Sequence, residues 1–186
     1  MRKIILNLAV SLDGFIEGPN GELDWLVRDE SIDFADILND ILIDKDIIFY
    51  GRISYEKWGH YQPEGNVSPK LKTAYNLLHS KTKYVFSRTK QSDDGKAIFI
   101  NANIKERVLE IVKEPGNNIW FYGGGKLATT FINADLIDVY KLAVHPVILG
   151  RGKPLFENIN ERHKLKLIDI KGFKSGITLQ TYEASK

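Results

Sequence analysis

Apolar runs of strand length alternate with stretches of helical periodicity through residue 133, and this alternation constrains the fold more than any other feature of the sequence. The strand-like runs lie at residues 3–10, 46–50, 83–87, 97–101 and 118–122. Apolar residues at helical spacing occupy residues 31–42, 68–78, 104–112 and 126–133, the first stretch behind Ser31 as a candidate N-cap. Such alternation predicts a mostly parallel sheet with helices on both faces.

The last quarter of the chain has a different pattern. Strand-like runs at residues 139–147, 164–173 and 177–182 follow one another without an intervening helical stretch, and glycines at 172 and 176 mark the final turn. We therefore predict an antiparallel C-terminal hairpin at the edge of the sheet. Since the sequence has no internal repeat and no long linker, we expect one three-layer α/β domain spanning residues 1–186. Ligands of such domains bind at the carboxyl ends of the strands.

Composition excludes several classes of function. The 186 residues include no cysteine, which removes disulfides, thiolate catalysis and cysteine-based metal sites, and the four histidines lack metal-ligand spacing. A net charge of +2 argues against nucleic acid as the main partner. The first apolar stretch, residues 4–10, is far shorter than a membrane span. We expect a cytoplasmic protein that binds neither metal, membrane nor nucleic acid.

Three consecutive glycines, Gly123, Gly124 and Gly125, connect the strand at residues 118–122 to a helix that begins near Lys126. Glycines at this position let phosphate groups approach the backbone and the N–H groups of the helix N-terminus. The spacing also fits the loose G-x-G-x-x-A pattern of dinucleotide-binding turns. The alternative is a tight turn with a structural role only.

Two further strand ends carry groups that bind anions. Gly51, Arg52 and Ser54 follow the strand at residues 46–50, and the sequence Ser87-Arg88-Thr89 ends the next strand. Guanidinium and hydroxyl groups suit phosphate oxygens, and together they predict a site for NADP, whose ribose carries an extra phosphate. The alternatives are a surface pair between Arg52 and Glu56, and an ordinary solvated strand end at residues 87–89.

The first strand runs into a glycine-rich segment that carries Asp13 and continues to Trp25. We call residues 12–26 the flap. Segments of this kind can close over a cofactor and exclude water, although turn formation alone also accounts for their glycines.

These segments together resemble the dihydrofolate reductase-like superfamily, specifically stand-alone proteins similar to the reductase domain of the bacterial bifunctional riboflavin-biosynthesis deaminase/reductase. The resemblance covers nearly the whole chain and includes the motifs at residues 9–14, 51–56, 87–89, 123–125 and 145–156. It implies an NADPH-dependent reductase, of the dihydrofolate reductase or 5-amino-6-(5-phosphoribosylamino)uracil reductase type, that transfers a hydride to a small pteridine- or pyrimidine-type substrate. It also implies a homodimer. The alternative is a non-catalytic protein of the same fold that binds NADP(H) or another nucleotide.

The resemblance also assigns residues to the cofactor. By this comparison the first strand and flap lie by the nicotinamide, the two strand ends hold the 2′-phosphate, and the glycine turn holds the pyrophosphate, often through a cis Gly–Gly bond. The residues that match are Ala9, Ile16, Gly51, Arg52, Ser54, Ser87, Arg88, Thr89, Gly123, Gly124, Gly125 and Lys126.

Two acids are candidates for catalysis. Asp13 matches the family aspartate that lies near the substrate ribose, whereas Asp33 is the candidate for the acid on the first helix of folate reductases. If Asp33 has that role, partial burial should raise its pKa. A solvated helical acid is the alternative for Asp33, as for Asp24 and Asp36. His145 is interpreted as structural rather than as a general acid.

Overall fold

The computed structural model describes residues 1–89 and 95–185, and these residues form two compact units. The first unit contains Met1–Arg2 and Glu30–Tyr122, and the second contains Lys3–Asp29 and Gly123–Lys186. Each unit includes strands of parallel sheet and at least one helix.

The strands of the first unit lie in the order β5-β4-β3-β6. Their bounds are Lys45–Gly51 for β3, Thr82–Phe86 for β4, Ile98–Ile100 for β5 and Asn118–Gly123 for β6. The pairs β3/β4 and β4/β5 are parallel. Residues Ile47–Tyr50 of β3 are almost fully buried, as expected for a parallel strand covered on both faces.

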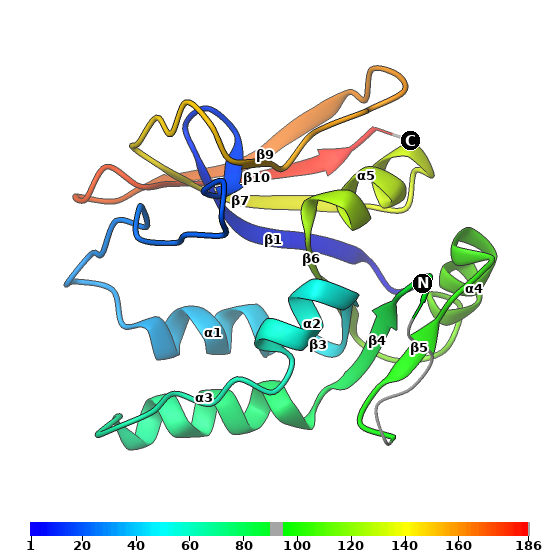
Figure 1. Ribbon diagram of the computed structural model, residues 1–186, viewed down its shortest axis with the longest axis horizontal. Coiled ribbons are helices and arrows are strands. Elements are labelled where there is room, and N and C mark those ends of the chain that lie inside the picture. Colours follow the sequence, from blue (N-terminus) through cyan, green and yellow to red (C-terminus); the bar gives the residue numbers. More distant parts are fainter. Residues whose placement is uncertain (90–94, 186) are drawn as a thin grey trace. The chain divides into compact units, whose positions relative to one another are not determined.

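The helices of the first unit are α1 (Phe34–Leu42), α2 (Arg52–Trp58), α3 (Pro69–Ser80) and α4 (Ile104–Ile111). Helices α1 and α3 pack against each other (Figure 1). Their buried faces, which include Leu38, Leu42 and Leu78, form one apolar core with Tyr50 and Val85 of the strands. Ser68 caps α3, and the cap of α1 is Asp33 rather than the predicted Ser31.

The second unit has strands in the order β1-β7-β10-β9 and one helix, α5 (Gly125–Asn133). Strand β1 (Ile4–Ser11) pairs in parallel with β7 (Val139–His145), and β10 (Thr178–Ala184) pairs antiparallel with both β7 and β9 (Leu165–Gly172). The hairpin of β9 and β10 extends from β7 (Figure 1). All eight residues of β9 are exposed.

The predicted α/β fold class is confirmed, with mostly parallel pairing and an antiparallel C-terminal hairpin. Two short strands that the sequence pattern does not predict, β2 (Phe15–Glu17) and β8 (Lys153–Pro154), pair with each other. Both are too short to give a periodic signal. Among the described residues, no helix is long and apolar enough to cross a membrane. The single-domain organisation stays a prediction.

Candidate functional site

In the first unit, the candidate anion-binding residues follow two adjacent strand ends. The register of the parallel strands aligns Gly51 of β3 with Phe86 of β4, and Phe86 with Ile100 of β5. Arg52 and Ser87, the residues that come next, therefore leave the sheet at the same edge. This placement agrees with the prediction that phosphate-binding groups gather at the carboxyl ends of the strands.

Arg52 opens α2, and its guanidinium is paired with the carboxylate of Glu56 at 2.6 Å. This is the surface pair that the sequence left open as an alternative. Both side chains are more than a third exposed, so Arg52 can readily exchange Glu56 for another anion. Ser54 lies in the same helix and is half-buried.

The segment after β4 is a hydrogen-bonded turn. Ser87 is buried, its Oγ accepts a bond of 3.3 Å from the N–H of Thr89, and its carbonyl accepts one of 2.7 Å from Asn101 Nδ2. Arg88 and Thr89 are exposed. Asn101 was missed by the sequence analysis, although its place directly after β5 was a usable signal. It holds the turn that presents the Arg88 side chain to solvent.

Asp33 has a structural role in the first unit. Its Oδ1 accepts a bond of 2.8 Å from the N–H of Ala35 as the N-cap of α1, and its Oδ2 accepts one of 2.9 Å from Lys70 Nζ. The bond from Lys70, and then that from Ala35, lower the pKa of this exposed carboxyl. The prediction of a raised pKa is therefore wrong, because the Asp33 carboxylate is exposed and paired with Lys70 and so stays ionised.

Asp13, in the second unit, fastens the start of the flap to a distant turn. Its carboxylate accepts bonds from Ser11 Oγ (2.7 Å), the N–H of Leu149 (3.1 Å) and the N–H of Gly150 (2.7 Å). Ser11 Oγ in turn accepts a bond of 2.9 Å from the N–H of Phe15. The bonds from Ser11, Gly150 and Leu149 lower the pKa of Asp13. The group is therefore an ionised acceptor at neutral pH and not a proton donor.

His145 pairs in register with Ser11 at the carboxyl ends of β7 and β1. Its Nδ1 accepts a bond of 3.0 Å from the N–H of Val27, and its ring packs edge-on against Trp25 with centroids 5.5 Å apart. Burial lowers its pKa. Because a ring nitrogen that accepts a bond carries no proton, the neutral ring holds its proton on Nε2. His145 thus anchors the far end of the flap.

The three glycines have three different environments. Gly123 has a positive φ of 91°, Gly124 is the N-cap of α5 with an ordinary extended backbone (φ −91°, ψ 166°), and no side chain caps the helix. A Cβ on Gly125 would lie 2.6 Å from the carbonyl oxygen of Pro154. Gly125 is therefore required by the packing of β8. All peptide bonds between described residues are trans, so the cis bond implied by the resemblance is not among them.

The other second-unit candidates lie as follows. Ile16 is in β2, and its Cδ1 lies 3.7 Å from the place where a Cβ at position 125 would stand. Ala9 is half-buried in β1, opposite Ala143 of β7, and Lys126 is exposed in the first turn of α5. The structure thus brings Ile16 to the start of α5.

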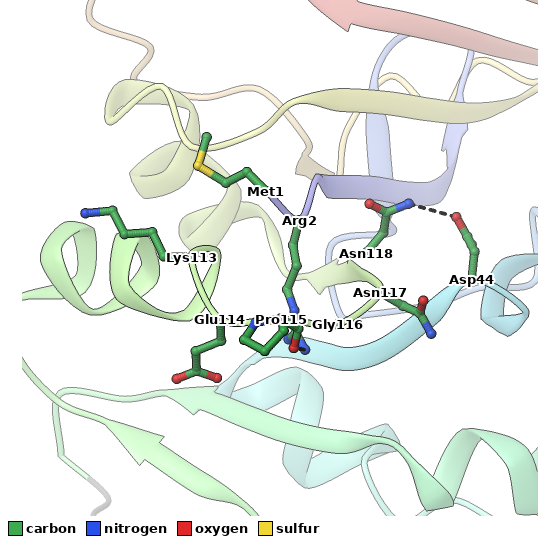
Figure 2. Close-up of a pocket in the computed structure, with 9 residues that line it drawn as sticks. All are labelled: Met1, Arg2, Asp44, Lys113, Glu114, Pro115, Gly116, Asn117 and Asn118. Carbon is green, nitrogen blue, oxygen red and sulfur yellow. Dashed lines mark hydrogen bonds between the residues drawn. The ribbon is translucent and has the colours of Figure 1, made fainter.

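A pocket of about 330 Å³ lies at the amino ends of β3 and β6, away from the candidate residues of the first unit (Figure 2). Arg2 lines it, but its Nη2 already donates to Asp46 Oδ2 (2.9 Å) and to the Pro115 carbonyl (2.8 Å). Asn118 is likewise bonded to Asp44. Among the described residues, the buried Nε and Nη1 of Arg2 and Oδ1 of Asp46 have no hydrogen-bond partner. The pocket contains none of the predicted cofactor residues.

Comparison with known proteins identifies the family. The model of the RibD C-terminal domain matches residues 2–179. The chain belongs to this family. Two proteins of Bacillus subtilis (strain 168) are related over almost their whole length. The uncharacterized protein YyaP is 50% identical over 97% of this chain and 94% of its own length, and YwjB is 33% identical over 98% and 99%.

Solved structures share the fold of this RibD C-terminal domain. A putative riboflavin biosynthesis protein from Shewanella sp. PV-4 has a TM-score of 0.80 at 23% identity, with both chains fully covered. A pyrimidine reductase-like protein from Corynebacterium diphtheriae has a TM-score of 0.69 at 14% identity, over 100% of this chain and 92% of its own. The Thermotoga maritima deaminase/reductase is longer, with 57% of its chain covered at a TM-score of 0.68 and 15% identity. The resemblance drawn from the motifs is confirmed.

Proposed function

We propose that this RibD C-terminal domain is an NADPH-dependent reductase that transfers a hydride to a small pteridine- or pyrimidine-type substrate. The observation that carries the proposal is the alignment of β3 and β4, which brings Arg52 and Ser87 out of the sheet at one edge, with Arg88 next to them. Family membership supports the reductase class.

The residues of each unit fit parts of this cofactor. In the first unit Arg88 is exposed on a turn fixed by Ser87 and Asn101, and Arg52 and Ser54 offer further donors toward a 2′-phosphate. In the second unit α5 begins without a side-chain cap, so its first N–H groups suit a pyrophosphate. Lys126 adds a positive charge at that helix start.

When bound, NADPH would supply the hydride. The chain's own residues would orient the substrate: a carboxylate has about four acceptor positions, and Asp13 uses three for Ser11, Leu149 and Gly150. The remaining position is suited to a substrate hydroxyl. Since Asp13 and Asp33 both have lowered pKa values, we propose that the proton is delivered by water.

The same pKa values favour a second candidate, a non-catalytic protein that binds NADP(H) or another nucleotide. Neither predicted acid is protonated at neutral pH, so neither can serve as the general acid. The two candidates differ in turnover and not in cofactor binding.

The test is cofactor binding followed by turnover. NADPH should bind more tightly than NADH, and Arg88→Ala should weaken NADPH by about 10- to 100-fold, because a hydrogen bond between charged groups contributes about 1.5–3 kcal/mol. NADH should be nearly unaffected. Arg107→Ala, which removes an exposed arginine from α4, is the control for charge alone. Equal losses for both cofactors would refute the 2′-phosphate assignment.

NADPH oxidation is then measured with dihydrofolate and with 5-amino-6-(5-phosphoribosylamino)uracil and related pyrimidines. Turnover of any of these supports the reductase. Tight NADPH binding without turnover of any supports the non-catalytic candidate.

A further inference from the structure

Two tyrosines of the first unit meet at the carboxyl ends of neighbouring strands. Tyr50 is the next-to-last residue of β3 and Tyr122 the next-to-last residue of β6, and each directly precedes the glycine of a proposed phosphate-binding turn. Their ring centroids lie 4.8 Å apart, and the rings are tilted by 35°. The two strands are neighbours in the sheet, and ligands of α/β domains bind at such strand ends. The pair therefore lies where a ligand is expected.

The hydroxyl of Tyr50 has no hydrogen-bond partner among the described residues. The residue is 0% exposed, so solvent at the surface does not replace the missing partner. Burial raises the pKa of this hydroxyl, and Tyr122 and Tyr55 raise it further. The group therefore keeps its proton and is a hydrogen-bond donor throughout the physiological pH range.

The packing around Tyr50 gives no reason for a hydroxyl. Tyr50 belongs to the apolar core that α1 and α3 form with the sheet, where side chains such as Ile48, Val85 and Trp120 carry no acceptor. A buried hydroxyl without a partner is unfavourable, and native proteins retain few of them. Phenylalanine would fill the same space without that cost. A ligand that accepts the bond accounts for the tyrosine.

Access to this hydroxyl depends on one side chain. The ring of Tyr55 also packs against Tyr50, at 5.7 Å between centroids, but Tyr55 is only 2% exposed. Tyr122 is half-buried, so the path from Tyr50 to the surface passes its ring. Rotation of Tyr122 about its Cα–Cβ bond would uncover Tyr50 and leave room for a flat ring of similar size.

We propose that the Tyr50 hydroxyl donates a hydrogen bond to a heteroaromatic ring of the ligand, while the ring of Tyr122 moves aside and stacks against that ring. The acceptor is a carbonyl oxygen or an unprotonated ring nitrogen. The nicotinamide of NADPH and a pteridine or pyrimidine substrate all carry such atoms. Stacked rings lie at centroid distances of about 4.5–7 Å, as Tyr50 and Tyr122 already do. This inference rests on the proposed function and adds a residue that recognises the ring.

The first measurement is the Tm of ligand-free Tyr50→Phe. This change keeps the ring and removes only the hydroxyl, so Tm should rise by about 2–4 °C as the cost of the unpaired group disappears. Tyr140→Phe removes a hydroxyl from another buried tyrosine, near the amino end of β7, and is the matched control; it should not raise Tm. A lower Tm in Tyr50→Phe would mean that the hydroxyl is already bonded, for example to a buried water, and would overturn the proposal.

The second measurement is ligand affinity. Calorimetry compares NADPH with 2′-phospho-ADP-ribose, which is the cofactor without its nicotinamide, and turnover gives the KM for dihydrofolate and for 5-amino-6-(5-phosphoribosylamino)uracil. Tyr50→Phe should weaken a ring ligand about three- to tenfold, as for one hydrogen bond. A loss for NADPH identifies the nicotinamide as that ring, and a higher KM at unchanged NADPH affinity identifies the substrate. The fragment without nicotinamide should bind as it does to the wild type, and Tyr140→Phe should bind every ligand normally.

The outcomes separate this inference from the proposed function. Unchanged affinity of Tyr50→Phe for every ring ligand would overturn the inference and leave the reductase in place. An equal loss for NADPH and for its nicotinamide-free fragment would also overturn it, because the fragment lacks the ring. A wild type that binds neither NADPH nor any substrate would refute the proposed function, and this inference with it.

Discussion

Alanine at Gly125 should destabilise the fold for a reason independent of any cofactor. A Cβ there would lie 2.6 Å from the Pro154 carbonyl oxygen, whereas ordinary contacts begin at 3.4 Å. The backbone of β8 would therefore have to move by roughly 0.8 Å, although it is paired with β2 and bonded from Leu155 N–H to the Gly14 carbonyl at 2.9 Å. Overpacking of this kind costs about 1–3 kcal/mol.

Gly124 is the matched control within the same turn. Its backbone angles are ones that alanine adopts freely, and such a replacement stabilises a protein by about 0.4–1 kcal/mol through the unfolded state. In a chain of this size 1 kcal/mol shifts Tm by about 2–4 °C. Gly125→Ala should thus lower Tm by about 2–12 °C, and Gly124→Ala should raise it by about 1–4 °C. Gly123→Ala should also lower it, because φ is 91°.

Thermal unfolding of the three cofactor-free variants, followed by circular dichroism, measures these shifts. NADPH binding is then measured on each folded variant. If the turn holds a pyrophosphate, Gly124→Ala will be more stable and yet bind NADPH poorly. An unchanged Tm in Gly125→Ala would refute the reasoning. A Tm lowered by several degrees in Gly124→Ala would refute it as well.

Three further predictions concern other parts of the chain. We propose that the protein is a homodimer formed through β9, where Leu167, Ile168 and Ile170 are 50%, 52% and 56% exposed. Light scattering at micromolar concentration should give the mass of a dimer for the wild type and of a monomer for Ile170→Lys. A monomeric wild type would contradict this. Burial lowers the pKa of His145 below its unfolded value of 6.5, so its contribution to stability is present above that pH and is lost as the pH falls. Between pH 7 and pH 5 the free energy of unfolding, measured with denaturant, should therefore fall less in His145→Asn than in the wild type. Asparagine keeps an acceptor for the N–H of Val27. An equal fall in both proteins would contradict this prediction. Asp33→Asn should leave the pH–rate profile of any turnover unchanged between about pH 6 and 8, since Asp33 is ionised throughout; a lost pH dependence would restore it as the proton donor.

The sequence predicted the positions of the strand ends well, because the buried runs that form β3, β4 and β6 are long enough to be recognised from composition alone. Glycine, arginine and serine directly after these runs then had to leave the sheet at its carboxyl edge. The pairing of Glu56 with Arg52 was also predictable, as an i, i+4 contact.

The state of Asp33 could not be predicted in the same way. Its pKa depends on Lys70, which is 37 residues away and meets it only because α1 packs against α3. A local pattern shows an acid before a helix, and both an N-cap and a buried catalytic acid fit that pattern. The capping bond to Ala35 and the exposure of the side chain distinguish them.

Asp13 shows a different difficulty, because a functional and a structural role rest on the same atoms. The bonds that keep it ionised also fasten the flap to the turn at Leu149 and Gly150, so a loss of activity in Asp13→Asn would not separate the two roles. Ser11→Ala does so. It removes the bond to Asp13 and the acceptor for Phe15 but leaves the carboxylate and both of its backbone donors. If Asp13 binds a substrate hydroxyl, this variant gains a free acceptor position, and its KM should not rise even where its stability falls.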